Sequence, residues 1–278
     1  MTQMLAGQAI VEALKAEGVR CVFGIPGGHV LGIYDGLYHT PEIRHVLVRH
    51  EQVAGNMAAA YAQLTGEVAV CLVTAGPGAT NLVSGIAEAY VGSLPIVILA
   101  GRGATATRHR GASQEIDTDK IFAPITKMAL RVDRADLLVD VVRQGFAAAR
   151  NGKPGPVYID IPRDILNEQV EFGPYFPVGA PVRPRGDSDR IRAAADILAR
   201  AERPIIVAGG GTVMSGAFAA LRELAEGLAI PVLTSLAGRG SIPDDHPLSV
   251  GGLGAHRNAL SKRLLAEAEG EENDSGED

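Results

Sequence analysis

Short apolar runs rich in β-branched residues alternate with helical patterns along most of the chain. The apolar runs cover residues 20–23, 43–48, 68–73, 95–100 and 156–161, and the helical patterns cover 4–16, 52–63, 78–91 and 137–150. Strands that are apolar on both faces need cover on both sides, and their alternation with helices favours parallel pairing. The sequence therefore predicts an α/β fold, with a mostly parallel sheet and helices on both of its faces.

A proline-rich segment divides the chain into two α/β units. Residues 169–187 carry four prolines and no periodicity, which is typical of a linker. We expect a first domain over residues 1–168 and a second, partial α/β domain over 188–268. The second unit shows only about two candidate strands, 204–208 and 231–234, which are few for an independent sheet. We therefore expect this unit to be truncated.

Composition and charge exclude several classes of protein. Without the seven acidic residues that begin at Glu267, 26 basic residues face 25 acidic ones, so the body offers no basic field for nucleic acid. Residues 269–278 are typical of a disordered acidic tail. No apolar run reaches the length of a membrane span, and the first residues lack the layout of a signal peptide. Cys21 and Cys71 lie in apolar runs and indicate buried free thiols, which are typical of a reducing compartment. We therefore expect a cytoplasmic protein, and from the charge and the apolar runs we expect no binding to nucleic acid or membranes.

Three glycine-rich or polar segments directly follow predicted strands. They read GIPGGH from Gly24, RHEQ from Arg49 and TAGPGATN from Thr74. The carboxyl ends of the strands form the edge at which open α/β sheets bind ligands. Taken singly, each segment also has a structural interpretation: a glycine turn, a glutamate near the positive end of a helix dipole, and an ordinary Gly-Pro-Gly turn.

Taken together, in this order and spacing, the three segments resemble the N-terminal, pyrimidine-binding domain of thiamine diphosphate enzymes of the acetolactate synthase type. The further elements of that family also follow in order. They are an apolar strand, the pair Gln114-Glu115, the sequence PITK from Pro124 and the sequence GPVYIDIP from Gly155. The resemblance covers about residues 3–165, and residues 188–268 are similar to the first half of the family's central domain.

The resemblance implies roles for individual residues. Glu51 matches the glutamate that, in such enzymes, hydrogen-bonds N1′ of the aminopyrimidine ring and favours the imino tautomer, through which C2 of the thiazolium loses its proton. Thr74, Pro77 and Asn81 match the loop that lines the pyrimidine. Gln114 matches a glutamine near the substrate.

The first loop departs from the family pattern at His29. Pro26, Gly27 and Gly28 match a loop that the family packs over the partner active site, and acetolactate synthases generally continue it with a small residue. A histidine in this position is similar to benzaldehyde lyase and cyclohexanedione hydrolase, where it faces the substrate. There His29 would relay protons and join Glu51 as a catalytic residue. The alternative, a turn histidine that faces solvent, stays open at this point.

The sequence lacks the half of such a site that holds the metal. The family's diphosphate-binding domain carries the sequence GDG followed later by paired asparagines, whereas the closest sequence here is Gly186-Asp187-Ser188 and no two asparagines are adjacent. We therefore expect no metal ligand from this chain and expect Mg²⁺ to be bound by a partner chain. Many acetolactate synthases bind FAD partly through the central domain, and whether this chain binds FAD stays open, because only about half of that domain is present. Gly209-Gly210-Gly211 does not complete a dinucleotide motif, since Met214 replaces its third glycine.

Two functional hypotheses follow from these observations. In the first, the chain is one subunit of a split thiamine diphosphate enzyme, a hetero-oligomer such as α2β2, whose second polypeptide carries the diphosphate-binding domain. The enzyme would decarboxylate a 2-keto acid such as pyruvate and transfer the acyl unit to an acceptor carbonyl. In the second, the chain is a non-catalytic binding or regulatory module, or a truncated remnant of such an enzyme. Only the first hypothesis requires a partner that carries the GDG and paired-asparagine sequences.

Overall fold

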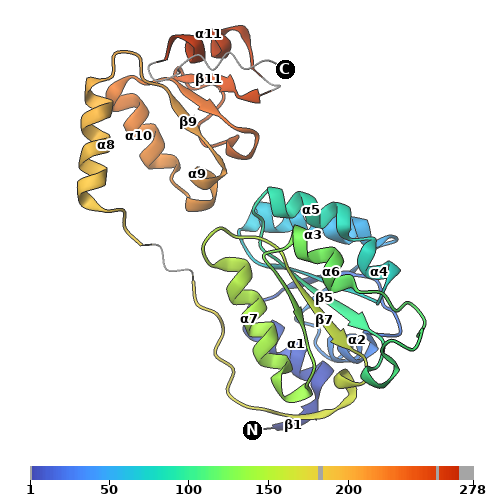
Figure 1. Ribbon diagram of the computed structural model, residues 1–278. Helices are drawn as coiled ribbons and strands as arrows, with labels where there is room; N and C mark the ends of the chain where they lie inside the picture. The colour runs from blue at the N-terminus through green and yellow to red at the C-terminus, as the bar shows by residue number, and fades with distance from the viewer. Residues whose placement is uncertain (1, 181–183, 255–256, 269–278) are drawn as a thin grey trace. The chain divides into compact units, whose positions relative to one another are not determined.

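The computed structural model describes residues 2–180, 184–254 and 257–268, and the chain divides into two compact units, residues 1–182 and 183–278 (Figure 1). The boundary between the units falls within the proline-rich segment. The expected acidic tail, residues 269–278, lies outside the described residues. Among the described residues, no helix combines the length and the apolarity needed to cross a membrane.

Unit 1 is built on a six-stranded parallel sheet with the strand order β3-β2-β4-β5-β7-β6. Its strands are β2 (Cys21–Gly24), β3 (Arg44–Leu47), β4 (Ala69–Val73), β5 (Ile96–Arg102), β6 (Met128–Arg131) and β7 (Val157–Pro162). The chain runs outward from β2 to β3 and then returns to β4 on the other side of β2. The carboxyl ends of β2 and β4 therefore flank a reversal of strand order, which is where open α/β sheets form a ligand crevice.

Helices cover both faces of this sheet (Figure 1). One face carries α1 (Ala6–Ala16), α2 (Leu31–Tyr38) and α7 (Leu138–Arg150), and the other carries α3 (Glu51–Thr65), α5 (Val83–Val91) and α6 (Thr118–Phe122). In β4, Val70 and Leu72 join the first core, while Ala69, Cys71 and Val73 join the second. Because successive side chains point to opposite faces, a strand covered on both sides buries every position, and all five residues of β4 are apolar and buried. The predicted α/β fold is confirmed.

Three strands of unit 1 were not evident in the sequence. The edge strand β6 is only half-buried, so its sequence MALR does not form an apolar run. Strand β1 (Thr2–Leu5) pairs in antiparallel fashion with β8 (Gln169–Phe172), at the start of the segment expected to be a linker. Two of the four residues of each strand are exposed, which leaves only a weak signal in the sequence.

The chain after β8 remains bound to unit 1. The hydroxyl of Tyr175 and the amide of Val178 both donate to Glu17 Oε1, at 2.9 and 2.8 Å, and Arg143 Nε donates to the carbonyl of Phe176 at 2.7 Å. These contacts hold an extended segment against α1 and α7 without giving it any periodicity. Part of the proline-rich segment is therefore ordered by polar contacts that run back to distant residues.

Unit 2 contains a three-stranded parallel sheet in the order β11-β10-β9. Its elements are α8 (Ser188–Arg200), β9 (Ile206–Ala208), α9 (Gly210–Ser215), α10 (Phe218–Leu228), β10 (Val232–Thr234), β11 (Ser249–Gly252) and α11 (Ala259–Glu267). The sequence showed β9 and β10. It did not show β11, because SVGG combines two glycines with incomplete burial. Short helices complete the two units: α4 (Pro77–Thr80) and the 3₁₀ turns Thr105–Thr107, Ala123–Ile125, Ala135–Leu137, Ile165–Asn167 and Leu236–Gly238.

Candidate functional site

Glu51 is the first residue of α3, and its carboxylate lies beside the turn that follows β4. Asn81 Nδ2 donates a hydrogen bond to Glu51 Oε2 at 2.8 Å. A Cβ on Gly78 would lie 3.4 Å from Glu51 Oε1 and 2.7 Å from the methyl group of Thr74, so the glycine keeps the space beside this oxygen open. Among the described residues, no group hydrogen-bonds Oε1. One oxygen of the half-buried carboxylate is thus held, and the other is available to a ligand.

The start of α3 explains why a carboxylate is stable in this position. His50 is the N-cap residue, with an extended backbone, and its Nδ1 accepts a hydrogen bond from the amide of Gln52 at 3.2 Å. The positive end of the helix dipole then favours a negative charge on Glu51. His50 therefore stabilises the start of α3, and the rigid helix fixes the direction of Glu51.

The turn after β4 directs Asn81 toward Glu51. Gly76 adopts φ 57° and ψ −113°, a left-handed conformation that other residues rarely adopt, and the short helix α4 begins at Pro77. The amide of Asn81 donates to the carbonyl of Pro77 at 3.0 Å, which closes the helical turn. Thr74 and Asn81 are half-buried at the two ends of this turn, and Pro77 is exposed on it.

The loop after β2 packs on the same turn. A Cβ on Gly27 would lie 2.5 Å from the Cβ of Thr74, so only glycine allows this approach. Pro26 and Gly28 are exposed. The loops that follow β2 and β4 therefore meet directly at the crevice that the strand order predicts.

His29 is half-buried at the end of this loop. Its Nδ1 lies 3.1 Å from Thr74 Oγ1, within hydrogen-bond distance. Burial lowers the pKa of His29, and the positive charge of Arg163 lowers it further, so both favour the neutral form of the imidazole. The ring lines a pocket of about 530 Å³ together with Ala104, Arg163 and Asn167. The histidine thus lines a pocket of sufficient size for a small molecule, in surroundings that favour its neutral form.

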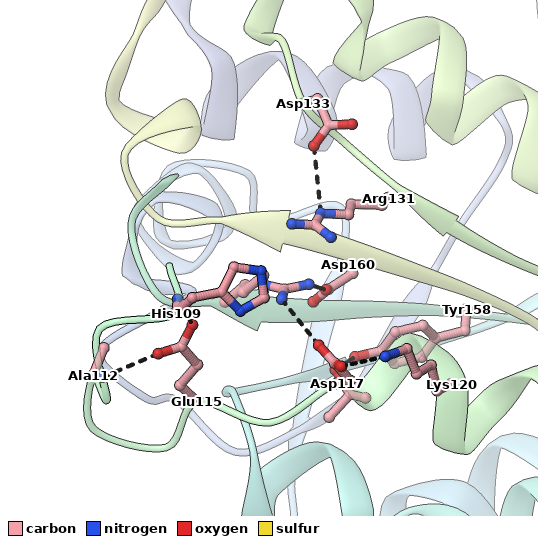
Figure 2. Close-up of polar contacts among 11 residues, drawn as sticks. His109, Ala112, Glu115, Asp117, Lys120, Arg131, Asp133, Tyr158 and Asp160 are labelled. Carbon is pink, nitrogen blue, oxygen red and sulfur yellow. Dashed lines mark hydrogen bonds and ion pairs between the residues drawn. The ribbon is translucent and has the colours of Figure 1, made fainter. Parts of the chain in front are cut away.

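Gln114 reaches the site through its backbone. It lies in the loop after β5 with φ 64°, and a Cβ on Gly76 would lie 2.5 Å from its carbonyl oxygen. The side chain of Gln114 is exposed. The carboxylate of its neighbour Glu115 accepts hydrogen bonds from the amides of His109 (2.5 Å) and Ala112 (3.1 Å), which lower its pKa (Figure 2). Glu115 therefore organises the loop.

A buried ion pair lies next to this loop, and neither of its residues was expected from the sequence to belong to the site. Arg102 Nη1, at the end of β5, donates to Asp160 Oδ2 in β7 at 2.5 Å, and both side chains are buried. The signal was present in the sequence, because Arg102 and Asp160 interrupt otherwise apolar strand sequences, IVILAGR and VYIDIP. No group of three or more His, Cys, Asp or Glu side chains among the described residues is arranged to hold a metal ion.

Comparison with known proteins matches both units to one family. Residues 4–121 match the family model described as "Thiamine pyrophosphate enzyme, N-terminal TPP binding domain", and residues 191–270 match "Thiamine pyrophosphate enzyme, central domain". Thiamine pyrophosphate is another name for thiamine diphosphate.

Full-length relatives agree with this match. The chain is 42% identical over 273 residues to a probable acetolactate synthase large subunit of Methanocaldococcus jannaschii, covering 96% of this chain and 46% of the relative. It is 42% identical over 260 residues to the acetolactate synthase isozyme 3 large subunit of Escherichia coli K12, covering 91% and 45%. The chain thus spans about half the length of the curated relatives that it matches. It belongs to the thiamine pyrophosphate enzyme family, as a partial chain of the acetolactate synthase type whose two units match the family's N-terminal and central domains.

Proposed function

We propose that this chain forms the pyrimidine side of a thiamine diphosphate site and that Glu51 activates the cofactor. The observation that carries the proposal is the arrangement of Glu51, Asn81 and Gly78 at the end of β4. Asn81 holds Glu51 Oε2 at 2.8 Å, while Gly78 leaves Oε1 accessible. A carboxylate with one fixed and one accessible oxygen fits a ring nitrogen that must share a proton.

The residues around Glu51 fit the aminopyrimidine ring. Glu51 Oε1 would hold the proton shared with N1′, and Thr74, Pro77 and Asn81 would line the ring. When bound, thiamine diphosphate supplies the electron sink for breaking and forming bonds at a carbonyl carbon. The neutral imidazole of His29 would then accept or donate protons on the substrate side, near the Gln114 loop.

The relatives indicate the class of reaction. Because they are named acetolactate synthases, we propose that the complete enzyme decarboxylates a 2-keto acid such as pyruvate and transfers the acyl unit to an acceptor carbonyl. The pocket lined by His29 also contains Arg163 and Asp164. The Asp164 carboxylate accepts hydrogen bonds from the amide of Thr105, and the positive charge of Arg163 suits the carboxylate of such a substrate.

We further propose that the diphosphate and Mg²⁺ are held by a second polypeptide, in an assembly such as α2β2. The 278 residues contain no GDG sequence and no adjacent asparagines. Apolar side chains are exposed on the two helices next to the site, which supports a protein surface that covers them. They are Val53, Met57 and Leu64 of α3, and Tyr90 and Val91 of α5.

The catalytic part of the proposal is tested with Glu51→Gln in the assembled enzyme, with thiamine diphosphate, Mg²⁺ and pyruvate. We expect turnover to fall at least about 100-fold, the usual minimum for a lost proton-transfer group, while the assembly stays intact. Glu88→Gln is the matched control, because Glu88 is an exposed glutamate on α5. Unchanged turnover in Glu51→Gln would refute the role of Glu51.

The arrangement of the chains is tested by native mass and peptide identification of the protein isolated from its own host. A stoichiometric second polypeptide with GDG and paired asparagines supports the split enzyme. The same sequences on one continuous polypeptide would refute the split and keep the cofactor site. A chain isolated without them in any form would favour the binding module.

A further inference from the structure

The buried pair of Arg102 and Asp160 joins two strands at the edge of the candidate site. Arg102 ends β5 and is 6% exposed, and Asp160 in β7 is fully buried. Their 2.5 Å hydrogen bond crosses between neighbouring strands. A buried ion pair is often no more stabilising than apolar residues of the same size, so its contribution to stability alone does not explain its position.

Arg102 also reaches the far end of the Gln114 loop. Its Nη2 lies 3.6 Å from Asp117 Oδ1, just before α6. This nitrogen is buried, and no hydrogen bond to it is formed among the described residues, so the longer ion pair is the contact that balances it. The other oxygen of Asp117 pairs at 2.6 Å with the exposed Lys120, as Figure 2 shows. Asp117 is thus held from the inside by Arg102 and from the outside by Lys120.

Three carboxylates hold the loop of residues 103–117 along its length. At its start, the amide of Thr105 donates to both oxygens of Asp164, at 3.1 and 3.0 Å. In the middle, Glu115 accepts from two amides of the loop itself (Figure 2). At the end, Asp117 pairs with Arg102. The last of these contacts is the one that connects the loop to the interior of the sheet.

The position of the loop determines the position of Gln114. Its carbonyl oxygen lies against Gly76, the residue that turns the chain toward Asn81 and the carboxylate of Glu51. Loss of the contact at Asp117 would weaken the hold on Gln114 beside Gly76, because Gln114 is only three residues away from Asp117.

We propose that Arg102 is a positioning residue that fixes the Gln114 loop against the Gly76 turn through its pairs with Asp160 and Asp117. The proposal rests on the proposed function only where it places Gln114 near a substrate. Arginine suits this task because its planar guanidinium presents separate nitrogens to two carboxylates on different elements, whereas a lysine ammonium is a single compact charge. Asp160 fixes one nitrogen, which leaves the other directed at the loop.

The test is amide hydrogen exchange of residues 103–117 in the assembled protein, measured by mass spectrometry in the wild type and three variants. We expect Arg102→Gln to raise exchange in this loop at least about 10-fold, with no comparable change in β4 or α3, because loss of a local anchor opens only the local segment. Arg102→Lys should restore part of the protection. Lys120→Gln is the matched control, since it removes the exposed partner of the same carboxylate, and it should leave the loop protected.

Activity provides a second readout that a purely structural arginine would not change. In the active assembly, Arg102→Gln should raise the KM for the 2-keto acid about 10-fold and leave the concentration of thiamine diphosphate needed for half-maximal activity unchanged. The exchange measurement needs no turnover, so it tests the positioning role of Arg102 even if the proposed reaction is wrong.

Asp117→Asn keeps the inference testable if Arg102→Gln does not fold. This variant leaves the pair of Arg102 and Asp160 intact and removes only the link to the loop, so it should raise exchange in residues 103–117 in the same way. Unchanged exchange in a folded Arg102→Gln, or in Asp117→Asn where Arg102→Gln does not fold, overturns the inference.

Discussion

The charge on Asp160 is expected to cost folding free energy, although Arg102 lies beside it. Burial raises the pKa of this carboxyl from 3.8 to about 6, and the positive charge of Arg102 lowers it only in part. The other charged groups that act on it are Asp119 of α6, which raises the pKa, and Arg131 of β6, which lowers it. Asp160→Asn removes the charge and keeps the shape of the side chain.

The sign and size of the effect follow from the two pKa values. As the pH rises, the unfolded chain releases this proton near pH 3.8, whereas the folded protein keeps it until about pH 6. Between these values the folded state binds more protons, so its free energy of unfolding falls as the pH rises. The difference of about 2 pH units corresponds to about 3 kcal/mol. Relative to the wild type, Asp160→Asn should therefore gain about 3 kcal/mol in free energy of unfolding between about pH 3.5 and pH 7.

The assay is urea unfolding of both proteins across this pH range, followed by tyrosine fluorescence. All six tyrosines lie in unit 1 and the chain has no tryptophan, so the signal reports the unit that contains Asp160. Asp136→Asn is the control, because Asp136 is an exposed partner of Arg134 and its pKa is lowered, which predicts a small change of the opposite sign. A wild type that gains stability relative to Asp160→Asn as the pH rises would show that the attraction of Arg102 outweighs burial, and would refute the reasoning.

Three further predictions concern other parts of unit 1. Glu17→Ala leaves Arg150 without its buried partner and frees the segment after β8, so urea unfolding should show a loss of about 3 kcal/mol, with faster amide exchange in residues 173–179. Gly85→Ala places a Cβ 2.8 Å from the backbone of α3, and the same assay should show a loss of about 1–3 kcal/mol; unchanged stability would mean that the two helices separate easily. Arg163→Gln removes a positive charge near His29 and should raise the pKa of that imidazole, measured by NMR titration; an unchanged pKa would leave burial as its whole cause.

The interior of the sheet could be predicted from the sequence because burial on both faces leaves a continuous apolar run, as in AVCLV of β4. The edge could not be predicted in the same way. Strand β6 is half-buried along its length, and β1 and β8 become strands only by pairing with each other across the whole unit. Their pairing depends on contacts between residues that are distant in sequence, which local patterns do not record.

The candidate site shows the same limit. The strand-end segments around Glu51 and Thr74 could be located from their order, but the hydrogen bond from Asn81 to Glu51 spans 30 residues and the pair of Arg102 and Asp160 spans 58. The sequence places Glu51 and Thr74 in segments that directly follow predicted strands. Which of these residues meet depends on the strand order, in which β4 lies next to both β2 and β5.

Because of that strand order, Glu51 and the loop that carries Gln114 are held by different elements at one edge of the sheet. Glu51 is fixed by the start of α3 and by Asn81, and both belong to the elements around β2 and β4. The loop that carries Gln114 is fixed by Arg102, at the end of β5, which pairs with Asp160 in β7. This loop meets the elements around β2 and β4 where the Gln114 carbonyl lies against Gly76. Because the two groups are held by different side chains, changes in the loop or its anchor can alter the contacts made with a substrate without displacing Glu51. The Arg102 and Glu51 variants should therefore affect different kinetic constants, substrate KM for the first and turnover for the second.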